Sequence, residues 1–140
     1  MPKVAVGILI KKEKNTISNK SDEMSVLLCQ RSKNALYPLK WEFPGGKIEG
    51  DESAPEALVR EVLEELNVRI ESFSLYFQRV NHYPDGRNFD VSYFLVDDFS
   101  GEMQNLEFEN IAWVRISQLT TFDILEGNKE IIEMLLETYA

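Results

Sequence analysis

Residues 46–68 read GKIEGDESAPEALVREVLEELNV, and this stretch decides the fold. Its apolar residues recur at the spacing of an amphipathic helix, and they are expected to form one buried arc. These residues are Leu58, Val59, Val62, Leu63 and Leu66. We expect Glu61, Glu64 and Glu65 in the opposite arc, near the C-terminal end of the helix, where backbone carbonyls already carry a partial negative charge. Because like charges at this spacing also repel, a bound divalent cation is the natural explanation for them.

The ends of the predicted helix have their own signals. Ser53 and Glu56 have the S-x-x-E spacing of a capping box, so Glu56 is interpreted as a cap and not as a metal ligand. Asn67 is expected to end the helix in a left-handed conformation. Ala54 and Ala57 are expected on the acidic side of the helix, where their short side chains leave room for a ligand.

The loop before this helix, residues 41–47, reads WEFPGGK. The adjacent Gly45 and Gly46 allow the backbone to approach a ligand closely. The chain then carries Glu52 toward the helix, which adds a carboxylate from a second element. Carboxylate oxygens from a loop and a helix suit a hard cation such as Mg²⁺, which is usually shared with substrate phosphates.

The alternative interpretation of the helix is a solvated acidic face. Arg60 can pair with Glu64 at i+4, which stabilises a helix by only about 0.2–0.5 kcal/mol. The double glycine in the preceding loop favours the metal site over this alternative.

The pattern of this region resembles the Nudix box, a signature with constrained residues at fixed spacing. The matching positions are Gly46, Glu52, Arg60, Glu61, Glu64 and Glu65. Asn67 stands where the family usually has glycine, which predicts a small stability cost and intact chemistry, because asparagine tolerates the left-handed conformation. Residues 4–8, Arg31 and residues 41–46 extend the similarity to the MutT-like branch of the family.

The resemblance implies a fold and a function. The expected fold is a single α/β domain over residues 1–140, a Nudix-type α/β/α sandwich with a mixed β-sheet between helices. The expected reaction is Mg²⁺-dependent hydrolysis of a nucleoside triphosphate, such as an oxidised purine or a pyrimidine nucleotide, to a nucleoside monophosphate and pyrophosphate. Mn²⁺ is an expected substitute cation. The alternatives are hydrolysis of another nucleoside diphosphate derivative and a non-catalytic nucleotide-sensing module.

The same hypothesis assigns roles to the acidic residues. The residues expected to act in catalysis are Glu52, Arg60, Glu61, Glu64, Glu65 and Glu107. The expected metal ligands are Glu61, Glu64, Glu65 and Glu107, together with the backbone of Gly45. A water made more acidic by the cation would attack phosphorus, with Glu61 or Glu107 as the base. Arg60 is expected to orient a glutamate.

The expected substrate-binding residues are Arg31, Phe43, Gly45, Gly46 and Asn128. Arg31 either contacts phosphate through its forked donors or closes a strand. Phe43 lines a base pocket or belongs to the core. Asn128 either recognises a base edge with its amide or caps the terminal helix.

Glu107 has two competitors for its role near the metal, Glu102 and Glu109, and simple surface placement is a further alternative for it. The single histidine, His82, has no second histidine or cysteine near it in sequence and is interpreted as a loop residue.

Composition points to a folded enzyme. The chain has 140 residues, of which 44% are hydrophobic and 28% charged, as in ordinary globular domains. No apolar run approaches the roughly 20 residues needed to span a bilayer, and the first residues lack the layout of a signal peptide. The single Cys29 is expected to be a buried, reduced thiol, so a cytoplasmic location is predicted.

The net charge of −9 bears on the partner. Nucleic acid polymers usually bind a basic surface, so they are not expected here. A small nucleotide remains compatible, because a metal ion can bridge an acidic protein and a phosphate. The oligomeric state is left open.

The remaining elements follow from short apolar patterns and turn signals. Strands are expected at 4–10, 24–31, 73–81, 89–96 and 109–115, a loop at 11–23, a turn at 84–86, and a helix at about 128–139. Ile131, Leu135 and Leu136 are expected on the inner side of this helix.

Overall fold

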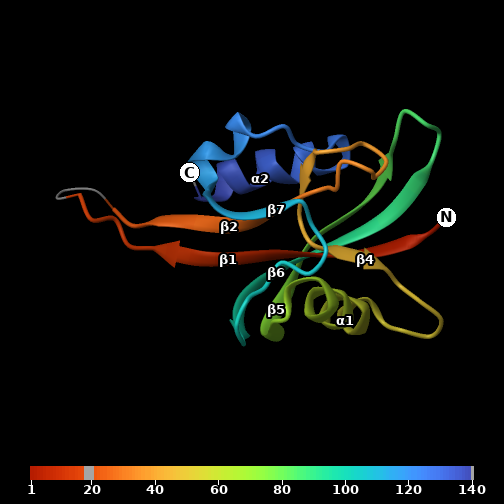
Figure 1. Ribbon diagram of the computed structural model, residues 1–140, viewed down its shortest axis with the longest axis horizontal. Coiled ribbons are helices and arrows are strands. Elements are labelled where there is room, and N and C mark those ends of the chain that lie inside the picture. The colour runs from red at the N-terminus through yellow and green to blue at the C-terminus, as the bar shows by residue number, and fades with distance from the viewer. Residues whose placement is uncertain (18–20, 140) are drawn as a thin grey trace.

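The computed structural model describes residues 1–17 and 21–139, in which a mixed sheet separates two helices (Figure 1). The sheet has seven strands in the order β3-β2-β1-β6-β5, with β4 paired to β1 and β7 paired to β2. Strands β1 and β6 are parallel and the other pairs are antiparallel. The predicted α/β/α sandwich is confirmed.

The strands are β1 (Lys3–Glu13), β2 (Glu23–Gln30), β3 (Trp41–Glu42), β4 (Gly45–Lys47), β5 (Arg69–His82), β6 (Asn88–Ser100) and β7 (Asn110–Arg115). The helices are α1 (Ala54–Leu66) and α2 (Lys129–Tyr139). Two 3₁₀ turns, η1 (Ile116–Thr121) and η2 (Glu126–Asn128), lie between β7 and α2.

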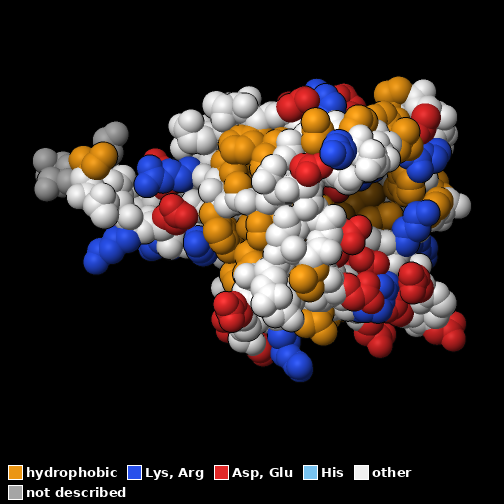
Figure 2. Space-filling model, in the orientation of Figure 1, with side chains coloured by type: hydrophobic (Ala, Val, Ile, Leu, Met, Phe, Trp, Pro, Cys, Tyr) orange, Lys and Arg blue, Asp and Glu red, His pale blue; other side chains and the backbone are white. Residues whose placement is uncertain are grey.

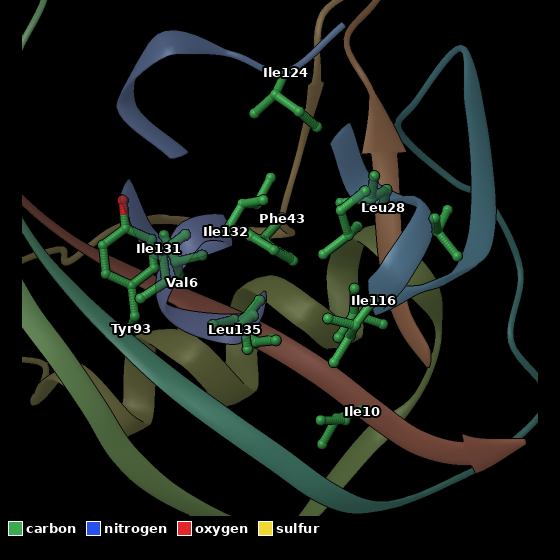
Figure 3. Packing of buried hydrophobic residues seen from close by; sticks show 14 of the residues in the cluster. Val6, Ile10, Leu28, Phe43, Tyr93, Ile116, Ile124, Ile131, Ile132 and Leu135 are labelled. Atoms are coloured by element: carbon green, nitrogen blue, oxygen red, sulfur yellow. The ribbon is translucent and has the colours of Figure 1, made fainter. Parts of the chain in front are cut away.

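Strand β1 shows why the core has two halves. Its residues Val6, Ile8 and Ile10 belong to the cluster that contains the buried side chains of α2 (Figure 3). Ala5 and Leu9, which point to the other face, belong to the cluster that contains the buried side chains of α1. A strand covered on both faces has no need for polar alternation, which explains the continuous apolar run in the sequence.

The predicted ends of α1 are confirmed. The Ser53 side chain accepts a hydrogen bond from the Glu56 N–H, and the Glu56 carboxylate accepts one from the Ser53 N–H. Asn67 ends the helix in the left-handed conformation with φ of 59°. These short-range signals position the helix along the chain before any tertiary contact is considered.

The predicted faces of α1 are wrong in part. Ala57, expected beside a ligand, is fully buried in the core cluster, whereas Leu63, expected in the core, is 44% exposed. Helix α1 packs on β1, β4 and β5, so its buried arc is centred near Leu58 and extends toward Ala57. Leu63 lies on the far side of that arc.

Several predicted boundaries need correction. The predicted loop at 11–23 is wrong at its ends, because pairing of β1 with β2 continues to the Glu13–Glu23 pair. Residues 18–20 of that loop lie outside the described residues. Strands β5 and β6 are longer than predicted, because they pair from the Arg69–Ser100 pair to His82–Asn88 across the predicted turn.

The predicted loop at 41–47 contains the two short strands β3 and β4. Their pairing with β2 and β1 is a long-range interaction that leaves little local pattern.

The predictions for α2 and for Cys29 are largely confirmed. Helix α2 begins at Lys129, and Ile131 and Leu135 are buried as expected. Ile132 is buried as well, whereas Leu136 is only half-buried. Cys29 is fully buried, and burial raises the pKa of its thiol. Neither helix of the described chain is both long and apolar enough to cross a bilayer.

Candidate active site

Strand β4 and helix α1 bring the double glycine against the glutamates. The Gly45 N–H donates a hydrogen bond to Glu65 Oε1 at 3.0 Å. Gly45 has φ of 149°, and a Cβ atom at this position would lie 2.2 Å from the backbone oxygen of Ala5 in β1. Only glycine therefore allows β4 to pair with β1 and to hold Glu65 at the same time.

Gly46 has a different role. A Cβ atom there would lie 2.3 Å from Cδ of Glu61, so the Glu61 carboxylate lies directly against the Gly46 backbone. The absence of a side chain at Gly46 leaves the space that this carboxylate occupies.

The expected position of the three glutamates opposite the buried face is wrong for two of them. The side chain of Glu61 is only 16% exposed, and Glu65 is half-buried beside β4. At about 100° per residue, Glu65 lies within about 20° of Leu58 around the helix. Glu64, whose side chain is 59% exposed, is the one that points to solvent.

Arg60 connects the helix with the preceding loop. Its Nε and Nη2 donate to the two carboxylate oxygens of Glu52 at 2.6 and 2.9 Å, and Nη2 also donates to the Lys47 carbonyl at 3.1 Å. Its Nη1 donates to Glu61 Oε1 at 3.0 Å and reaches Glu64 Oε2 at 3.5 Å. Arg60 thus orients the acidic residues, and Glu52 anchors Arg60.

The acids in this site repel one another. The pKa of Glu65 is raised to about 9, chiefly by burial and also by the charges of Glu61, Glu42 and Glu107, while the Gly45 N–H opposes the rise. Burial also raises the pKa of Glu61, against the effect of Arg60. A cation would favour the charged form of both carboxylates.

The residues fit a hard divalent cation, although the described residues contain no cluster of three His, Cys, Asp or Glu side chains that could hold a metal. Glu65 and Glu61 supply half-buried oxygens, and Gly46 provides space beside them. Mg²⁺ usually takes one or two protein carboxylates and completes its shell with waters and substrate phosphates. The chemistry of the donors therefore suits Mg²⁺ better than a metal that needs a complete protein cage.

A cavity of about 400 Å³ opens beside these acids. Figure 2 shows acidic side chains gathered over α1 with a basic side chain among them. We call the wall formed by Gly45, Gly46, Glu65 and Glu107 the carboxylate side of the cavity. Glu107 lies on this wall, whereas the backbone oxygen of Glu102 binds Asn67.

Glu109, the third candidate, accepts a hydrogen bond from the Lys33 N–H through its carboxylate. Among the three glutamates considered from the sequence, the structure therefore brings only Glu107 to the cavity.

Arg31 and Phe43 also line the cavity. Nη1 of Arg31 pairs with the carboxylate of Glu42 at 3.1 Å, and its Nε donates to the Leu36 carbonyl at 2.8 Å. Burial raises the pKa of the Glu42 carboxyl, and Arg31 opposes that rise. Phe43 is 4% exposed and serves both the core and the cavity wall, so its two predicted roles coincide.

We call the wall formed by Asn81, Tyr93 and Asn128 the amide side of the cavity. Asn128 is 6% exposed, and its side chain makes no hydrogen bond to the first turn of α2 within the residues described. Asn128 lies at the cavity, and its role in base recognition stays a prediction.

The sequence analysis missed Asn81 and Tyr93. The available signal was a polar residue, Asn81, within a predicted strand. Bulges in β5 interrupt the alternation of side chains, so alternation alone does not tell which face of the sheet Asn81 occupies. His82 ends β5 and is exposed, and it is not among the residues that line the cavity.

Acids held against a double glycine beside a cavity of this size are typical of sites for metal-assisted chemistry on phosphates. The NUDIX domain family matches residues 1–135, and the chain belongs to this family. The predicted family is therefore confirmed.

Two curated relatives are similar over most of the chain. The 8-oxo-dGTP diphosphatase of Escherichia coli strain K12 is 32% identical over 132 residues, which cover 94% of each protein. The CTP pyrophosphohydrolase of the same organism is 30% identical over 111 residues, covering 79% of this chain and 82% of the relative.

A solved structure shows the same fold. The MutT NUDIX hydrolase of Burkholderia pseudomallei superposes with a TM-score of 0.77 and 22% identity, covering 94% of this chain and 95% of that one. The predicted class of enzyme, a Nudix hydrolase, agrees with these relatives, and Nudix hydrolases generally use a divalent metal.

Proposed function

We propose that this protein hydrolyses a nucleoside triphosphate to a nucleoside monophosphate and pyrophosphate with Mg²⁺ as the cation. The observation that carries this proposal is the pair Glu61 and Glu65, held by Gly45 and Gly46 beside a cavity of about 400 Å³. That volume falls in the range of small-molecule sites. The relatives named for 8-oxo-dGTP and CTP support a nucleotide substrate.

The residues divide the chemical work. Glu61, Glu65 and the more exposed Glu64 would hold the cation, together with the Gly45 backbone and Glu107. When bound, the cation neutralises phosphate charge and makes a coordinated water more acidic. Arg60 keeps Glu61 in place through its fork, which Glu52 anchors.

Proton removal from the attacking water falls to Glu61 or Glu107. Glu61 is the better oriented of the two, because Arg60 and the Gly46 backbone fix its carboxylate. Glu107 is exposed and lines the cavity.

Phe43 and the amide-bearing Asn128 would receive the nucleoside. Phe43 offers an apolar surface for a base, and Asn128 offers an amide that both donates and accepts hydrogen bonds. Arg31 lines the same cavity in its pairing with Glu42, where its forked donors would meet a phosphate.

The surface charge of the protein bears on its partner. With a net charge of −9, the surface favours a small metal-bridged nucleotide over a nucleic acid polymer. A cytoplasmic location remains a prediction, in keeping with a nucleotide substrate.

Chromatographic detection of nucleotide products tests the proposal over a panel of nucleotides with and without Mg²⁺. We expect a nucleoside monophosphate from at least one nucleoside triphosphate, only with the cation present. Turnover only of dinucleoside polyphosphates or nucleotide sugars would move the enzyme to another Nudix reaction. Binding without turnover of any compound would indicate a nucleotide sensor.

A further inference from the structure

The amide side of the cavity contains a chain of hydrogen bonds that ends in an unpaired acceptor. Asn81 Nδ2 donates to Tyr93 Oη at 2.9 Å, and Tyr93 Oη donates to the Gly127 carbonyl at 3.0 Å. Asn81 is 3% exposed and Tyr93 is 1% exposed. Within residues 1–17 and 21–139, no donor reaches Asn81 Oδ1.

The orientation of the Asn81 amide follows from this chain. The Gly127 carbonyl can only accept, so Tyr93 uses its single hydroxyl proton there. The Tyr93 oxygen then offers only lone pairs to Asn81, which must turn its NH₂ group toward it. Asn81 Oδ1 is therefore the atom that remains without a partner.

An unpaired acceptor in this position is unusual. Folded proteins leave very few buried polar atoms unsatisfied, because each one loses its bonds to water without a replacement. The atom belongs to a side chain that lines the cavity, and Asn128 follows Gly127 directly on the same wall. Oδ1 is itself buried in the ligand-free protein, so a ligand that brings a donor to this wall would satisfy it after a small shift of the Asn81 side chain toward the cavity.

We propose that Asn81 Oδ1 accepts a hydrogen bond from an amino or imide N–H on the edge of the nucleobase, so that Asn81 makes hydrolysis depend on the base. This inference rests on the proposed nucleotide substrate. Tyr93 acts as a positioning residue, because its hydroxyl fixes which end of the Asn81 amide faces the ligand. Asn128 supplies a second amide to the same edge.

The chemistry defines a matched pair of substrates. Every common nucleobase carries at least one N–H group, whereas ribose 5-triphosphate carries the same phosphates and no base. A group that contacts only the base affects the nucleotide and leaves the sugar triphosphate unchanged. Groups that act on the phosphates affect both compounds alike.

The test is Asn81→Leu, a substitution of similar size without polar atoms. For the nucleoside triphosphate that the enzyme hydrolyses fastest, we expect kcat/KM to fall about tenfold, the value of one hydrogen bond. For ribose 5-triphosphate we expect no change. The melting temperature of the ligand-free protein should be equal or higher, because the buried unpaired acceptor is gone.

Ser25→Ala is the matched control. Ser25 Oγ is the other buried side-chain atom without a partner among the described residues, and Ser25 is fully buried in β2 and does not line the cavity. This variant should leave kcat/KM unchanged for both compounds, without loss of stability.

Equal losses for both compounds, or an unchanged value for the nucleotide, would overturn the assignment of Asn81. If Asn81→Leu fails to fold, Tyr93→Phe serves instead, because it removes the hydroxyl that orients the amide. We expect it to lower the ratio of nucleotide to ribose 5-triphosphate hydrolysis by a smaller factor, and an unchanged ratio would contradict the inference.

Failure of the proposed function has a different signature. The wild-type protein would then hydrolyse neither compound. In that case calorimetry of nucleotide and ribose 5-triphosphate binding to the wild type and to Asn81→Leu gives the answer. Weaker nucleotide binding in the variant, with unchanged sugar triphosphate binding, supports the role of Asn81, and equal binding of the nucleotide overturns it.

Discussion

The carboxylate side of the cavity crowds half-buried acids around two glycines, whereas the amide side sets neutral polar groups in an apolar wall. Burial and then the neighbouring acids raise the pKa of Glu65, and a cation would favour its charged form. On the amide side, Asn81 Nδ2 donates to the Tyr93 hydroxyl, whereas Asn81 Oδ1 has no partner among the described residues. The carboxylate side is therefore suited to any diphosphate with its cation, and the amide side is suited to the base of a nucleotide.

This comparison predicts the largest effect for Glu65→Gln. We expect kcat to fall by about 10²–10³-fold, for nucleotides and for ribose 5-triphosphate alike, because the charge that holds the cation is lost. The metal-free variant should melt at an equal or higher temperature, because the raised pKa of Glu65 makes folding take up a proton at neutral pH and glutamine removes that cost. Steady-state kinetics and thermal melts in a chelator measure both.

Glu102→Gln provides the control for this prediction, because Glu102 is an exposed glutamate that does not line the cavity. It should change neither kcat nor the melting temperature. Near-normal turnover of Glu65→Gln at saturating Mg²⁺ would refute the metal assignment.

The two glycines give the next largest effect and separate activity from stability. In Gly46→Ala the new methyl group displaces the end of the Glu61 side chain, so kcat should fall by about 10²-fold with little change in melting temperature. In Gly45→Ala the methyl group meets the Ala5 backbone, so the protein should be clearly destabilised. Similar stability losses in both variants would show that the different roles of the glycines are misassigned.

Arg60→Lys tests the orientation of the acids with a smaller change. Lysine keeps the charge but lacks the fork that holds both oxygens of Glu52 together with Glu61. We expect about a tenfold loss of kcat for both substrates of the matched pair. The control is Arg69→Lys, an exposed arginine of β5. A loss confined to the nucleotide would place Arg60 in base recognition and contradict the separate roles of the carboxylate side and the amide side.

The smallest effect concerns stability and pH. The hydrogen bond from Arg60 lowers the pKa of Glu52 from 4.5 to about 2. Between these values the unfolded chain binds more protons than the folded one, so this contact stabilises the protein above pH 4.5 and ceases to do so as pH falls toward 2. Urea unfolding should therefore show wild type more stable than Glu52→Gln at neutral pH, with a difference that shrinks on acidification. A difference that grows as pH falls would contradict this.

The ends of α1 were predictable from sequence because they depend on neighbours within four residues. Ser53, Glu56 and Asn67 act through local hydrogen bonds and backbone conformation. The family signature likewise singled out Gly46, Arg60 and the glutamates by their spacing alone. The family itself is confirmed by the match of the NUDIX domain to residues 1–135.

The orientation of the glutamates was not predictable in the same way. Glu61 and Glu65 face inward because β4 pairs with β1 and presents its glycine backbone to that side of α1. Apolar periodicity marks buried helix faces by their hydrophobic residues, so it misplaces an acid that a long-range contact buries. Asn81 was not predicted for a related reason. Strand β5 shifts register at several points along β6, and a long-range pairing of this kind is not visible in the local sequence.

Calorimetric titration of Mg²⁺ into the pure protein, with a non-hydrolysable nucleoside triphosphate present, tests the central claim most directly. We expect uptake of Mg²⁺ by the wild-type protein and a loss of that uptake in Glu65→Gln. If the wild-type protein takes up no Mg²⁺ under these conditions, the acids beside the double glycine do not form a cation site, and the proposed hydrolysis fails with it.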